Sequence, residues 1–171
     1  MMELHMHTHH LESRAPDWVA AAVSGFLGGA AIMVLELLWS ALITGSSPWA
    51  VSHRISAIVM GPDALRLTEF NVPIVATALI THYILGIIFG LVMCMIIAPF
   101  HFDSSVGMVL ISGVVFGLAL YVFNFYGMSR IFPWFSEMRG GAALVTHVIF
   151  GMVTGLAYWA LERRERRNPR H

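Results

Sequence analysis

The chain has 171 residues, of which 57% are hydrophobic and only 12% are charged. Its formal net charge of zero gives no electrostatic basis for binding nucleic acid, and its single cysteine excludes an intrachain disulfide or a cysteine-based zinc or iron–sulfur site. A soluble domain carries about 25% charged residues, so this chain lacks the polar surface to cover a globule in water, and we expect the lipid bilayer to be its solvent.

Four apolar stretches follow one another along the chain. Each is near or above the roughly 20 residues that a helix needs to cross the hydrocarbon core of a bilayer. They are Trp18–Ile43, Val72–Ala98, Ser105–Gly127 and Gly141–Leu161. The first is too long for the apolar part of a signal peptide and has no basic segment before it. We therefore predict an all-α polytopic membrane four-helix bundle over residues 18–161.

The segments around these helices differ in composition. Residues 1–17 form a tail rich in His and Met, which we expect to be flexible, although these side chains are also ligands for copper, nickel or zinc. Residues 44–71 are rich in turn formers, and Trp49–Met60 within them is expected to form a short helix in the membrane interface. The connection Met128–Arg139 is short and aromatic, and residues 162–171 form an arginine-rich tail.

The arginines predict the orientation in the membrane. With four crossings both termini lie on one side, and six of the ten basic residues belong to that side. They are Arg14, Arg163, Arg164, Arg166, Arg167 and Arg170. Since cytoplasmic segments are enriched in basic residues, we expect both termini in the cytoplasm.

The two halves of the chain resemble each other. Ala-Leu-Ile-Thr-His ending at His82 matches Ala-Leu-Val-Thr-His ending at His147, and the first and third helices match at a second constant offset, which pairs Glu36 with Asn124. We therefore predict a tandem, parallel repeat of two helical hairpins. Glycines recur at the same offsets on one face of each helix, where small residues let helices pack closely. They are Gly25, Gly29, Gly86, Gly90, Gly113, Gly117, Gly151 and Gly155.

Four polar residues lie well inside the apolar stretches, and we call them the polar cluster: Glu36, His82, Asn124 and His147. Glu36 and Asn124 are near the ends of helices that run outward, and both histidines are near the starts of helices that run inward. All four should therefore lie in the outer half of the bilayer. They share faces with the glycines, which should face the interior of the bundle. A charged carboxylate facing lipid would cost at least about 2.5–3.5 kcal/mol, so we expect all four side chains to converge in the interior.

Three interpretations of the polar cluster stay open at this point. Glu36, His82 and His147 could ligate a transition-metal ion, or the two histidines could hold haem b from both sides. The cluster could instead handle protons or a solute in a small transporter or channel subunit, since intramembrane carboxylates and histidines relay protons. Thirdly, it could be a purely structural hydrogen-bonded network.

Aromatic and basic residues flank the outer end of the predicted bundle. We expect them to form an outer rim, either a lid or an interfacial aromatic belt. They are Trp49, His53, Arg54, Tyr126, Arg130 and Trp134. The sequence contains no nucleophile–base arrangement, phosphate loop or nucleotide motif, so it predicts no enzyme activity. We expect a small membrane subunit or accessory protein, whose partner would be another membrane protein or a second copy.

Several motifs resemble those of a group of small four-helix bacterial membrane proteins. They are Ser47-Pro48-Trp49, Ile58–Gly61, Asn124–Gly127, Phe132–Phe135 and the last helix with His147, and the likeness covers most of residues 18–161. The resemblance implies a bacterial inner membrane. Such proteins are sometimes called sodium:proline symporters, a function that we do not expect here because those symporters have many more helices than four.

Overall fold

The protein is built from helices. The computed structural model describes five segments of the chain, namely residues 16–44, 47–67, 69–100, 102 and 104–167. Residues 1–15 of the predicted tail and the last residues, 168–171, lie outside this description. Within the described residues, four segments are long and apolar enough to cross a membrane: Trp18–Ile43, Val72–Ile97, Val106–Arg130 and Gly141–Glu165. The predicted all-α polytopic bundle is confirmed.

The first half of the chain contains two long helices with a compact segment between them. Its elements are α1 (Trp18–Trp39), the π-helical turn η1 (Ser40–Thr44), α2 (Ala50–Met60), the 3-10 helix η2 (Pro62–Arg66) and α3 (Val72–Ile97). Polar caps start both long helices. The Asp17 carboxylate accepts a hydrogen bond from the Ala20 amide at 2.9 Å, and the Asn71 side chain accepts one from the Ile74 amide at 3.2 Å. The short helix expected at Trp49–Met60 occurs as α2.

The second half also contains two long helices, with a shorter segment between them. Its elements are α4 (Val106–Val122), the π-helical turn η3 (Phe123–Gly127), the 3-10 helices η4 (Met128–Arg130) and η5 (Pro133–Met138), and α5 (Gly141–Arg167). α5 extends beyond the predicted end at Leu161 into the arginine-rich tail. Glu and Arg are good helix formers, and the Arg163 guanidinium lies 4.4 Å from the centre of the Trp159 ring one turn earlier.

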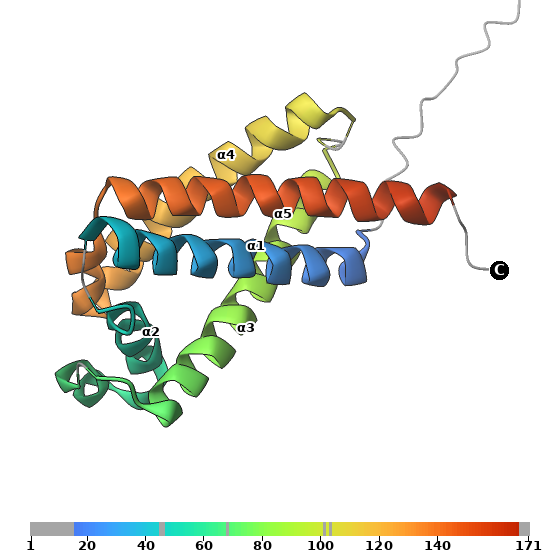
Figure 1. The fold of residues 1–171 in the computed structure, drawn as a ribbon. Helices are drawn as coiled ribbons and strands as arrows, with labels where there is room; N and C mark the ends of the chain where they lie inside the picture. The colour runs from blue at the N-terminus through green and yellow to red at the C-terminus, as the bar shows by residue number, and fades with distance from the viewer. Residues whose placement is uncertain (1–15, 45–46, 68, 101, 103, 168–171) are drawn as a thin grey trace, which may run out of the picture.

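α1 and α5 form the central pair of the bundle. They lie side by side and antiparallel, α3 packs against α1, and α4 packs against α5 (Figure 1). α3 and α4 contact each other little. α1 therefore begins and α5 ends at the same end of the bundle (Figure 1). We call the opposite end, which is formed by α2 and η3–η5, the capped end.

Glycines make the closest contacts between helices. An added Cβ would come within 3.0 Å of an atom of a neighbouring helix at Gly25, Gly86, Gly90, Gly113, Gly117, Gly151 and Gly155. In the first half Gly25 faces Gly86 and Gly90, and in the second half Gly113 faces Gly151. At Gly29 there is more room, since its Cβ would lie 3.6 Å from His82 Nε2. The backbones of each hairpin are therefore in direct contact.

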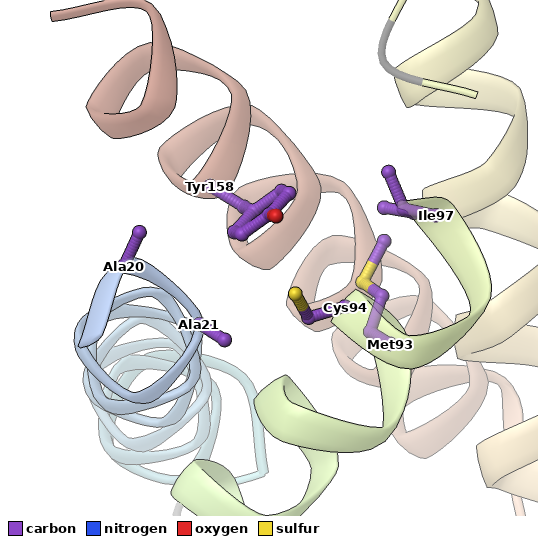
Figure 2. Packing of buried hydrophobic residues seen from close by; sticks show 6 residues of the cluster. All are labelled: Ala20, Ala21, Met93, Cys94, Ile97 and Tyr158. Carbon is purple, nitrogen blue, oxygen red and sulfur yellow. The ribbon is translucent and has the colours of Figure 1, made fainter. Parts of the chain in front are cut away.

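A buried apolar cluster joins α1, α3 and α5 near the termini (Figure 2). Its members are Ala20, Ala21, Met93, Cys94, Ile97 and Tyr158. The Tyr158 hydroxyl also accepts a hydrogen bond from the Asp17 amide at 3.4 Å, which ties the start of α1 to the end of α5. This half of the bundle is well packed, and the main cavity lies in the other half.

Candidate functional site

The four residues of the polar cluster line one cavity. It has a volume of about 180 Å³ and lies in the half of the bundle nearer the capped end. α1 contributes Glu36, α3 contributes His82, the π-helical turn η3 contributes Asn124 and α5 contributes His147. One group thus comes from each of the four membrane-spanning segments. The close glycine contacts hold α1 to α3 and α4 to α5, and so fix these side chains around a common space.

His147 uses both of its ring nitrogens. Nδ1 lies 2.8 Å from the Ala143 carbonyl oxygen one turn earlier, and because a carbonyl can only accept, Nδ1 carries the proton. Nε2 then accepts a hydrogen bond from the Asn124 amide nitrogen at 3.1 Å. The imidazole in this arrangement is neutral, and Asn124 fixes its orientation toward the cavity.

His82 is held across the first hairpin. Its Nε2 lies 2.8 Å from the Gly29 carbonyl oxygen of α1, so Nε2 donates to that oxygen. This bond has no counterpart in the second half, where His147 bonds to a side chain. The spacing of the sequence predicted that the two histidines are equivalent, but their hydrogen-bond partners differ. The difference follows from the Gly29 position, where α1 leaves room for the imidazole ring.

Glu36 differs from the other three members because its carboxylate has no hydrogen bond or ion pair with another described residue. It is partly buried and lines the main cavity and also a smaller one of about 40 Å³. His82 lines both cavities too. An unpaired carboxylate inside an apolar helix is energetically costly, so a partner from outside the chain would stabilise it.

The rest of the cavity wall is apolar and largely aromatic. Six phenylalanines from α3, α5 and the capped end line it: Phe89, Phe123, Phe125, Phe132, Phe135 and Phe150. α2 closes the wall with Val51, Ile55 and Ile58. An apolar cavity with a few convergent polar groups is the usual form of a small-molecule site.

The six residues predicted as an outer rim lie at the capped end but behind the cavity wall. None of them is among the described residues that line either cavity. Trp134 Nε1 donates to the Arg54 carbonyl at 3.1 Å and so joins η5 to α2. Trp49 packs on Phe70, with ring centres 4.8 Å apart. Tyr126 and Arg130 are exposed. Trp134 thus joins two elements of the cavity wall without lining the cavity itself.

His53 is the most buried of these rim residues. Only 3% of its surface is exposed, and its Nδ1 donates to the Trp49 carbonyl at 2.7 Å. Its Nε2 has no hydrogen-bond partner among the residues that the structure describes. It sits on α2 beside Ser56 and Ala57, which are also buried, so it belongs to the packing of this helix.

Two residues important for the site were not predicted from the sequence. Arg139 donates from Nε to the Phe125 carbonyl at 2.8 Å, and its guanidinium lies 4.3 Å from the centre of the Tyr126 ring, so it holds the turn that carries Asn124. Gly28 lies at the contact of α1 with α5, where an added Cβ would collide with Thr154 and then with Phe150. The sequence does not reveal either contact, because Arg139 reaches back to a carbonyl 14 residues earlier and Gly28 meets side chains of another helix.

The geometry gives no support to a metal ion or haem held by Glu36, His82 and His147. No three His, Cys, Asp or Glu side chains of the described residues are grouped so as to hold a metal ion. Both histidines direct Nε2 at a protein partner, so ligation of iron or another metal through these atoms would break bonds to Gly29 and Asn124.

Comparison with known proteins adds no assignment to this site. No protein-family model, no curated protein and no solved structure matches the chain. The function is therefore argued from the cavity and from the side chains that line it.

Proposed function

We propose that this protein is a small membrane-embedded subunit that binds a small, mainly apolar organic molecule in its internal cavity. The observation that carries the proposal is that Glu36, which has no polar partner among the described residues, lines the same cavity as His82, Asn124 and His147. Ionisable residues inside membrane helices mark substrate or proton pathways because their burial is otherwise too costly. The subunit would thus take part in handling a solute.

A purely structural role accounts for only part of the cluster. The hydrogen bond between Asn124 and His147 is of the kind that holds helices together in a membrane. A structural network would, however, use Glu36 as an acceptor for one of the neighbouring side chains. Glu36 instead faces two cavities and has no such bond. A binding role explains both the unpaired carboxylate and the space beside it.

The location and orientation belong to the same proposal. We place the protein in a bacterial inner membrane with both termini in the cytoplasm, on the basis of the resemblance to small bacterial membrane proteins and of the arginine distribution. The cavity would then lie in the outer half of the bilayer. A tandem repeat of two hairpins is supported by the equivalent glycine contacts, Gly25 with Gly86 and Gly113 with Gly151.

The proposal can be tested by filling the cavity. Val51 on α2 lines both cavities, whereas Val59 on the same helix lines neither and is 66% exposed. We would measure thermal unfolding of the wild type, Val51→Trp and Val59→Trp in detergent with a panel of small aromatic amines, alcohols and acids. A ligand at 100 times its Kd stabilises the folded state by about 2.7 kcal/mol.

We expect at least one compound to raise the Tm of the wild type and of Val59→Trp but not that of Val51→Trp. The proposal would be wrong if no compound raised the Tm of the wild type. It would also be wrong if the same compounds raised the Tm of Val51→Trp equally, because they would then bind elsewhere on the protein.

A further inference from the structure

The charges of the cavity wall are unbalanced. Glu36 is the only acidic residue among the described residues that line the cavity, and neither cavity is lined by an arginine. His147 does not compensate for it, because the bonds to Ala143 and Asn124 define a neutral imidazole. His82 directs its Nε2 to the Gly29 carbonyl and forms no ion pair with Glu36. When Glu36 is ionised, the cavity carries a net negative charge with no internal partner.

Arg139 binds the backbone of a wall residue, Phe125, but its charge is engaged elsewhere. The Arg139 Nε donates to the Phe125 carbonyl, and its terminal nitrogen donates to the Ser129 hydroxyl at 3.2 Å. Its guanidinium also lies over the face of the Tyr126 ring. Its guanidinium is therefore bound on the outer side of η3. Arg139 therefore does not compensate for Glu36, and a cationic ligand would supply the missing charge.

The six phenylalanines of the wall favour a ligand with a positive charge. The face of an aromatic ring is electronegative and attracts a cation, most strongly where water is excluded. A strongly hydrated metal cation would also need several oxygen ligands, and Ca²⁺ takes six to eight of them. The described side chains of the wall offer only the Glu36 carboxylate and the Asn124 amide oxygen. The wall therefore suits a cation whose own surface is apolar.

We infer that the cavity binds a monovalent organic cation, an amine or quaternary ammonium with a small aromatic or aliphatic body, with its charge beside Glu36 and its body among the phenylalanines. This inference rests on the proposed function and names its ligand class. An anion would be repelled by Glu36, and a neutral molecule would leave the carboxylate without a partner. A cation satisfies both the carboxylate and the aromatic wall.

The test uses two probes of the same shape that differ in charge. Phenyltrimethylammonium carries a positive nitrogen where tert-butylbenzene has a neutral carbon. Binding of each would be measured by equilibrium dialysis with the full-length protein in lipid nanodiscs, and with empty nanodiscs to subtract partition into lipid. The variants are Glu36→Gln, Glu36→Asp and the control Glu69→Gln, which changes an exposed carboxylate outside both cavities.

We expect the wild type and Glu69→Gln to bind the cation at least about tenfold more tightly than the neutral probe, a difference of about 1.4 kcal/mol. Glu36→Gln should lose that preference, and Glu36→Asp should keep part of it. Circular dichroism of each variant checks that the helices are intact. Equal binding of both probes by the wild type, or a preference for the cation that survives in Glu36→Gln, would overturn the inference and leave the binding cavity itself in place. Binding of neither probe would overturn the inference, while the compound panel and Val51→Trp test the cavity independently.

Discussion

Gly25→Ala is expected to destabilise the contact between α1 and α3, whereas Gly29→Ala, one turn further along the same face, is not. At Gly25 an added Cβ would meet backbone atoms of α3, namely the Gly86 carbonyl oxygen and, at 3.0 Å, the Gly90 Cα. Backbone atoms cannot rotate away, so the helices would have to separate. At Gly29 the nearest atom would be His82 Nε2 at 3.6 Å, which is an ordinary van der Waals distance.

The two substitutions form a matched pair from which the steric cost can be isolated. Each replaces glycine by alanine in the same helix, and each gains the same intrinsic helix propensity, about 1 kcal/mol. This gain cancels when the two variants are compared. Inserting a methyl group into a packed interface costs about 1–3 kcal/mol. We therefore expect the free energy of unfolding of Gly25→Ala to be about 1–3 kcal/mol lower than that of Gly29→Ala.

The assay is reversible unfolding in dodecylmaltoside micelles with increasing SDS, followed by far-ultraviolet circular dichroism. Gly113→Ala in the second hairpin, whose Cβ would lie 2.7 Å from the Gly151 carbonyl oxygen, should resemble Gly25→Ala. If Gly25→Ala and Gly29→Ala have the same free energy of unfolding, α1 and α3 do not approach as closely as described. The placement of Glu36 opposite His82 would then lose its basis.

Three further predictions concern the site and its orientation. Asn124→Leu removes the hydrogen bond to His147 and should lower the free energy of unfolding by about 0.6–1.7 kcal/mol in the same titration. Arg139→Gln removes the bond to the Phe125 carbonyl and should cost about 1 kcal/mol, and Arg139→Lys should not restore it because an ammonium cannot reproduce the guanidinium geometry. A green fluorescent protein fused to the C-terminus should fluoresce and an alkaline phosphatase fusion should be inactive, and the opposite pair of results would reverse the orientation.

The membrane-spanning segments could be predicted from the sequence because the bilayer leaves few alternatives. Backbone polar groups in hydrocarbon must be bonded within the helix, so each long apolar stretch has to form one. The starts of α3 and α5, at Val72 and Gly141, agree with the prediction. The end of α5 differs from the prediction, because hydropathy does not distinguish a solvated helical turn from a polar segment without regular structure. Arg163 over Trp159 is a local contact that hydropathy ignores.

The site could be predicted only in part. Glycine spacing indicated which faces of the long helices meet, and polar residues on these faces were therefore placed in the interior. The wall residues of α2, Val51, Ile55 and Ile58, have helical spacing, but that spacing does not show which part of the protein they face. Their position in the wall depends on tertiary contacts, such as the bond from Trp134 Nε1 to the Arg54 carbonyl, which joins residues 80 positions apart. The unpaired state of Glu36 likewise follows from three-dimensional packing.

The most direct test of the binding cavity is to locate a probe inside the protein by nuclear magnetic resonance. Isoleucine methyl groups would be labelled with ¹³C, and cross-relaxation from the protons of phenyltrimethylammonium and of tert-butylbenzene would be recorded in deuterated micelles. Ile32 and Ile55 line the cavity, whereas Ile111 on α4 is 61% exposed on the outer surface. We predict contacts from at least one probe to Ile32 and Ile55, and none to Ile111 beyond those made by detergent. Contacts to Ile111 alone, or none to the cavity methyl groups at saturating probe, would contradict the account.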